Sequence, residues 1–246
     1  MISADKKSAG SANASNASGS ANASGSANAS GSANASNALE QKEQLDRISE
    51  AIFTIASNNR FYSNIYAELY NSLITNYEFI RETLNKRLIH FPESFDDIQW
   101  CEPHLDYDKY CDINKENESR RALTLFYVNL MKRNVIDKNI IIDLINKIQK
   151  QLLKEINEEN KKEIVEELSE IVSVLVINTF TPESCWDFIK QNNWIIHWKE
   201  NNHNIYDNVC EFASKKTKNY TSLSNKSIFK HMDIRDSLNN LISKVN

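Results

Sequence analysis

From Leu39 to its last residue the chain contains no glycine, and this absence limits the folds open to it. All four glycines lie before Leu39, and the only prolines are Pro92, Pro103 and Pro182. Tight hairpin turns and glycine-rich phosphate loops need residues that adopt positive φ without strain. The composition therefore argues against all-β folds, dinucleotide-binding Rossmann units and P-loops.

The glycines belong to an N-terminal tract of a different character. Residues 8–38 contain only Ser, Ala, Asn and Gly and repeat variants of the hexapeptide GSANAS. Such a composition offers no large side chains to bury and favours a random coil. We therefore predict that residues 1–38 form a disordered or engineered linker and that residues 39–246 form the folded domain.

Apolar residues recur at helical spacing through this predicted domain. The stripes predict an all-α fold with helices at Leu45–Ile55, Phe61–Leu73, Tyr77–Ile89, Leu123–Leu130, Ile141–Ile156, Ile164–Leu175, Ile205–Phe212 and Ser224–Val245. The segment from Phe91 to Glu116 is predicted to be a long connection. Asn160 and Glu163 have the spacing of a capping box, and Thr181–Pro182 is typical of a helix start.

The predicted helices form pairs joined by short turns, which favours stacked helical hairpins. Each pair alone cannot bury its apolar face, so neighbouring pairs must stack and leave extended surfaces. Surfaces of this kind usually bind large partners.

Charge and cysteine content indicate a cytoplasmic protein. The formal net charge is −4, so any RNA contact must come from a local patch. Four cysteines without a signal peptide suggest free thiols in a reducing compartment. The longest apolar run, Ile171–Ile177, is far too short to span a bilayer, and no membrane contact is expected.

Three segments carry a pattern that a known family shares. Ala51–Leu73 reads AIFTIASNNRFYSNIYAELYNSL, with an Ile–Phe pair followed by a Phe and a Tyr–Ala helix. Ser119–Ile136 reads SRRALTLFYVNLMKRNVI, an arginine-led helix with a central Phe. Ser224–Leu238 reads SNKSIFKHMDIRDSL, with a Phe followed by Asp-aliphatic-x-Asp. In this order and spacing they resemble the middle domain of eukaryotic translation initiation factor four-G.

The resemblance implies a HEAT-like α-solenoid, a right-handed stack of antiparallel helical hairpins, in a viral or protist version of the factor. It implies a scaffold that clamps the two lobes of a DEAD-box RNA helicase of the initiation factor four-A type. Other initiation factors and weakly bound RNA would be further partners. Holding both lobes near the closed geometry would replace active-site chemistry, so we expect no enzyme activity and no cofactor. Adaptors in nuclear cap-binding, splicing and RNA decay share the fold and are the alternative.

The resemblance also assigns the two ends of the clamp. One end is the first-repeat turn, and the other is a pair of acids on the last helix; the residues are Asn58, Asn59, Arg60 and Phe61, and Asp233 and Asp236.

A basic patch late in the chain is the candidate RNA-binding site. Its residues are Lys215, Lys216, Lys218, Lys226 and Lys230, with Tyr220 and Phe229 nearby. The lysines could pair with phosphates and the aromatic rings could stack on bases. A solvated lysine-rich loop is the alternative interpretation.

Two further clusters are weaker candidates. Cys101, His104 and Cys111 bring three soft ligands together, but zinc needs a fourth, and neither His90 nor Cys185 has diagnostic spacing. We therefore predict no metal site, and a metal-dependent enzyme is the distant alternative. The tryptophans at positions 186, 194 and 198 suit either partner contact or core burial. No catalytic triad is recognisable.

Overall fold

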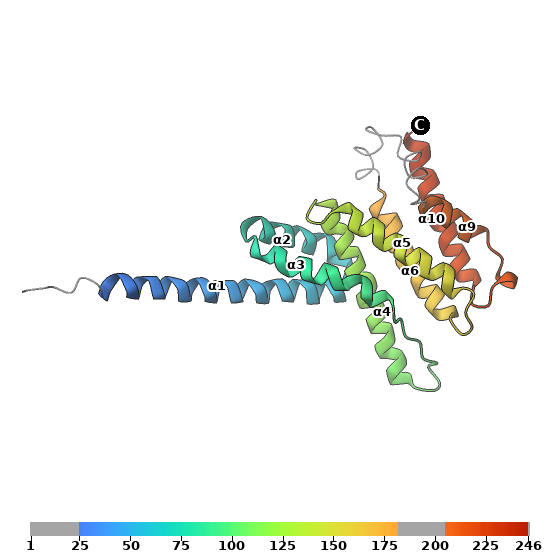
Figure 1. Cartoon of the computed structure of the whole chain (residues 1–246). Coiled ribbons are helices and arrows are strands. Elements are labelled where there is room, and N and C mark those ends of the chain that lie inside the picture. The colour runs from blue at the N-terminus through green and yellow to red at the C-terminus, as the bar shows by residue number, and fades with distance from the viewer. Residues whose placement is uncertain (1–24, 182–204, 246) are drawn as a thin grey trace, which may run out of the picture. The chain divides into compact units, whose positions relative to one another are not determined.

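The computed structural model describes residues 25–181 and 205–245, and every regular element in these residues is helical (Figure 1). The α-helices are α1 (Gly25–Asn58), α2 (Ser63–Asn76), α3 (Phe79–His90), α4 (Tyr107–Lys132), α5 (Lys138–Glu155), α6 (Lys162–Thr179), α9 (Ile205–Ser214) and α10 (Asn225–Val245). Three 3₁₀ turns are η1 (Arg60–Tyr62), η2 (Phe91–Phe95) and η3 (Thr217–Asn219). The prediction of an all-α fold is confirmed. None of the helices in the described residues is long and apolar enough to cross a membrane.

The chain divides into two compact units, Met1–Gln44 and Leu45–Asn246. In the first unit, α1 begins at Gly25, so residues 25–38 of the predicted linker are helical. Alanine has the highest helix propensity, and extending an existing helix costs far less than starting one. Nine of residues 25–38 are Ser, Asn or Gly, which are weaker helix formers, so this tract continues α1 mainly because extension is cheap. Residues 1–24 lie outside the described part.

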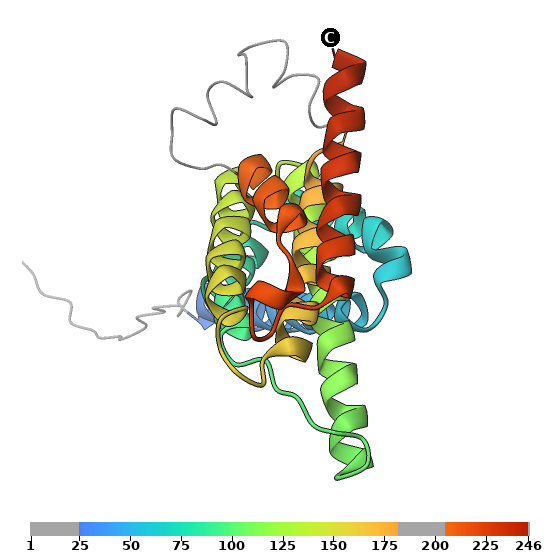
Figure 2. The same cartoon turned by 90° about the vertical axis from the view of Figure 1, so that its right-hand side faces the viewer.

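In the second unit, four helices contact one another in chain order. Helix α2 packs on α4, α4 on α6, and α6 on α10 (Figure 1). Helix α5 lies beside α6, and α9 lies beside α10, as the view turned by 90° also shows (Figure 2). Helices α4 and α6 therefore lie between α2 and α10.

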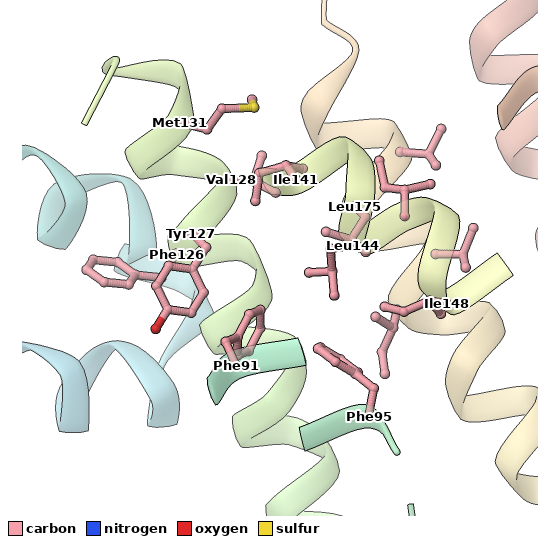
Figure 3. Packing of buried hydrophobic residues seen from close by; sticks show 14 of the residues in the cluster. Phe91, Phe95, Phe126, Tyr127, Val128, Met131, Ile141, Leu144, Ile148 and Leu175 are labelled. Carbon is pink, nitrogen blue, oxygen red and sulfur yellow. The ribbon is translucent and has the colours of Figure 1, made fainter. Parts of the chain in front are cut away.

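One contiguous apolar core joins these helices. Figure 3 shows its middle, where Phe91 and Phe95 of η2 lie beside the lower part of α4 and below α5. The ring of Phe91 lies 4.4 Å from that of Tyr127, and the aliphatic side chains of α5 and α6 fill the other side. Because aromatic rings bury large apolar areas, η2 fixes the connection after α3 firmly against α4.

The predicted stripe on α2 is not the buried one. The buried positions are Ser63, Ala67, Tyr70 and Ile74, whereas Phe61, Ile65 and Leu69 are exposed. Small residues let α4 approach closely, and Ser63 accepts a hydrogen bond of 3.0 Å from the amide of Asn129. Tyr70 reaches α1 through a 2.9 Å hydrogen bond with Ser49. The core face of α2 therefore consists of both small and large residues. The spacing of apolar residues alone does not identify such a face.

Two predicted boundaries are wrong. The connection predicted from Phe91 to Glu116 is shorter, because α4 begins at Tyr107, where Asp106 accepts a 2.9 Å hydrogen bond from the Lys109 amide. The first turns of α4 are polar, so they give no apolar stripe. The capping box at Asn160 does not form, because Asn160 has a φ of 58° and Lys161 is the N-cap instead.

Candidate functional site

The first-repeat turn is held by its own side chains. The side chain of Asn59 accepts a 3.1 Å hydrogen bond from the Phe61 amide, and that of Asn58 donates to the Thr54 carbonyl at 2.8 Å. Phe61 is 86% exposed and meets the Tyr62 ring edge-on at 5.4 Å. The turn therefore presents an aromatic side chain to solvent on a fixed backbone.

This aromatic side chain begins a longer apolar surface. Ile65 and Leu69 follow Phe61 at four-residue steps and are 58% and 47% exposed. We call Phe61, Ile65 and Leu69 the α2 row. The opposite face of α2 lies in the core, so this helix is apolar on two sides. An amphipathic surface helix normally turns its polar side to water, and a clustered exposed apolar surface usually marks a contact with another molecule.

The predicted acids of the last helix lie on a different element. Asp233 and Asp236 are exposed on α10, on the side away from the buried Ile234 and Leu238. Asp236 pairs with the neighbouring Arg235 at 3.0 Å. Since α4 and α6 separate α2 from α10, the structure does not bring the acids together with the first-repeat turn.

Three of the five lysines in the predicted RNA patch form ion pairs. Lys226 and Lys230 of α10 reach Glu166 and Glu170 of α6 at 2.9 and 3.1 Å. Lys215 pairs with Glu211 at 2.6 Å, and its ammonium lies 5.0 Å from the centre of the Tyr220 ring. These contacts tie neighbouring elements together.

The other two lysines of the patch, Lys216 and Lys218, are exposed around η3. The Phe229 ring on α10 is 60% exposed. The ion pairs leave the side chains of Lys226 and Lys230 63% and 28% exposed, so the five-lysine patch stays a prediction.

Two adjoining cavities of about 480 and 400 Å³ lie between the end of α1, α3, η2 and α4. Phe91, Ser94 and Leu123 line both. The Ser94 hydroxyl donates to the Phe91 carbonyl at 2.7 Å, and His90 pairs with Glu93 at 3.2 Å. Within the described residues the histidine and the serine do not hydrogen-bond to each other, so they are not assembled as a nucleophile–base pair. Sequence reasoning missed this groove because its walls come from separate helices.

The arginines of the quoted segment on α4 have structural partners. Arg121 makes a bidentate ion pair with Glu167 of α6, a carboxylate that is only 5% exposed, and a 2.6 Å pair with Glu118. The hydrogen bonds to Glu167 raise the pKa of Arg121 above its usual range. Arg120 donates to the Ser94 carbonyl at 2.9 Å, and its burial lowers its pKa. These side chains join α4 to its neighbours, and Arg120 also lines the smaller of the two cavities.

The cysteine–histidine loop has no metal-binding geometry in the described residues, among which no group of three or more suitable side chains gathers. The Cys101 thiol lies 3.6 and 3.7 Å from the carbonyls of Glu102 and Asp106. His104 lies 3.8 Å from the Glu102 carboxylate. Cys185, the predicted helix start at Pro182 and the three candidate tryptophans lie outside the described residues.

The chain matches no family model, no curated protein and no solved structure. Its resemblance to the initiation-factor domain therefore depends on the three quoted segments alone.

Proposed function

We propose that the chain is a non-catalytic helical scaffold of translation initiation that binds a DEAD-box RNA helicase of the initiation factor four-A type. The order of helix contacts supports the solenoid part of this proposal. Helices α2, α4, α6 and α10 contact one another in turn, and α5 and α9 lie beside α6 and α10 respectively. A stack of helical hairpins requires contacts in this order.

The observation that carries the binding role is the exposure of Phe61. The resemblance puts one end of the clamp at this turn, and the turn is where a fixed backbone holds an aromatic ring in solvent. Aromatic residues that are rigid before binding contribute strongly to protein interfaces. The acids of α10 supply a charged second end, separated from the first by α4 and α6. A weak RNA contact would involve the lysine patch, in which Lys216, Lys218 and Lys226 are exposed.

A titration with a purified helicase of this type tests the proposal. Reversing both acids, Asp233→Lys with Asp236→Lys, should weaken the complex by at least about 1 kcal/mol, or about fivefold in Kd. Phe61→Ala should weaken it at the other end by a comparable or larger factor. Asp143→Lys on α5 is the matched control, because Asp143 is also an exposed helical acid but lies outside both ends.

A helicase ATPase assay with and without the scaffold gives the second measurement. If the scaffold stimulates the ATPase activity, and if the acid reversal and Phe61→Ala both reduce that stimulation, the result would agree with a clamp that holds two lobes. Equal affinity for the parent chain, the acid reversal and Phe61→Ala would remove the assignment of both ends.

A further inference from the structure

The α2 row is an apolar ridge that the second unit leaves in solvent. Its three side chains are 86%, 58% and 47% exposed, and Tyr62 beside them is 49% exposed. Within Ser63–Asn76 the only charged residue is Glu68, so little charge interrupts this face. Helix α2 lies at the edge of the helices it packs with (Figures 1 and 2).

The row is symmetric about its middle residue. Leu69 stands four positions after Ile65 within α2, and Phe61 stands four positions before it, in the η1 turn that leads into the helix. Residues four apart form the ridges that interlock in the commonest class of helix packing, with axes crossing near about −50°. Two copies of this ridge, placed antiparallel with their Ile65 side chains at the twofold axis, set Phe61 of each copy opposite Leu69 of the other.

The flanking charges match the same arrangement. Arg60 comes directly before Phe61, and Glu68 directly before Leu69. When Phe61 faces Leu69 of a second copy, Arg60 comes close to the Glu68 of that copy, and the symmetry makes the pair twice. Both side chains are exposed, and the one ion pair of Glu68 among the described residues is a 4.0 Å contact with Arg133. An interface of this kind is self-complementary in shape and in charge.

From the exposed row and its paired charges we infer that the α2 face binds the same face of a second copy of this chain, forming an antiparallel twofold dimer. This inference does not depend on the helicase. Phe61 belongs to both surfaces, so dimer formation and helicase contact at this turn exclude each other.

Sedimentation equilibrium of the full chain tests the dimer, at concentrations from about 1 μM to about 100 μM. The average mass should rise with concentration from the 28.3 kDa of one chain toward twice that value. Ile65→Glu should return the mass to that of one chain, because it places two carboxylates at the twofold axis. Ile89→Glu is the matched control, since Ile89 is 69% exposed on α3 and lies outside the row.

A charge exchange tests the orientation. Arg60→Glu alone should weaken the dimer on the order of tenfold, and Arg60→Glu combined with Glu68→Arg should restore it. A mass that stays at one chain over the whole range would overturn the inference, and so would a dimer that survives Ile65→Glu. A dimer that Ile65→Glu dissolves but that the double exchange leaves weakened would overturn the antiparallel register. Circular dichroism melts show whether each variant is folded.

Discussion

Two asparagines take positions that glycine usually occupies. Asn134, after α4, and Asn160, before α6, both have a φ of 58°. Asparagine tolerates the left-handed region better than most residues, because its short side chain can bond locally to the backbone. A chain without glycine in its folded part can therefore still turn sharply between helices, which is why the absence of glycine excluded some folds without excluding helical hairpins.

The most perturbed histidine in the described residues is His231, on α10. It is 1% exposed, its Nδ1 donates to the Ser227 carbonyl at 2.9 Å, and its ring stacks on Phe212 at 4.0 Å. Burial lowers the pKa of His231 from 6.5 to about 4. The side chain is therefore neutral in the folded protein at physiological pH and acts as part of the core.

This shift predicts a loss of stability in acid. Between pH 6.5 and about 4 the unfolded chain binds a proton at His231 and the folded chain does not, so falling pH favours unfolding. This loss in the free energy of unfolding is absent above pH 6.5 and grows by about 1.4 kcal/mol per pH unit below it, down to a pH of about 4. Urea unfolding gives the free energy of unfolding at pH 7 and at pH 5.5. The difference between these two values should be smaller for His231→Gln than for the parent chain. An equal difference in the two proteins would contradict the expectation.

At the scale of elements, the Arg121–Glu167 pair joins α4 to α6. Arg121→Met leaves the carboxylate of Glu167 buried without its partner, and we expect a loss of about 3 kcal/mol in the free energy of unfolding. Arg121→Met combined with Glu167→Met should recover part of it, because no buried charge is then left unpaired and Glu118, the other partner of Arg121, is exposed. Lys115→Met breaks an exposed pair with Asp112 and should cost less than about 1 kcal/mol. Chemical denaturation measures all three, and similar losses for Arg121→Met and Lys115→Met would show that burial adds nothing to the inner pair.

The elements differ in how well the sequence predicts them. Helices α3 and α5 follow clear apolar stripes, and Asp137 caps α5 through a 2.8 Å hydrogen bond to the Asn139 amide. The start of α4 was missed because its polar turns are stabilised by a cap and by local charges. The face of α2 that the sequence predicts to be buried is the exposed one. The buried face escapes prediction because Ser63 and Ala67 pack closely without being strongly apolar. Periodicity finds helices, but the choice of the buried face depends on the shape of the neighbouring helix.

The candidate site was predictable to a similar extent. The turn at Asn58–Phe61 came from the resemblance, and its hydrogen bonds follow from Asn side chains that any turn can use. The ion pairs of the lysine patch were not predictable, because Glu166 and Glu170, which pair with Lys226 and Lys230, lie about sixty residues earlier in the chain. Contacts between residues so far apart in sequence appear only when the helices are placed.

At the scale of the second unit, a single apolar core runs from Leu45 in α1 to Leu238 in α10. We therefore expect the stacked helices to unfold together. Ile234→Ala in α10 removes a fully buried side chain and should cost about 2–5 kcal/mol. Native-state hydrogen exchange should show this loss for the most protected amides of α2 as well as of α10. A loss confined to α9 and α10 would instead show that the stack unfolds in separate parts.

Helix α6 has neighbours on three sides, α4, α5 and α10, and more than half of its residues are buried, including Glu167, Ser169 and Ser173. A change of side-chain size there disturbs three interfaces at once. Over evolutionary time this helix should therefore accept the fewest substitutions in the described part of the chain, while an outer helix such as α2 is free to acquire new binding partners without rebuilding the middle of the stack.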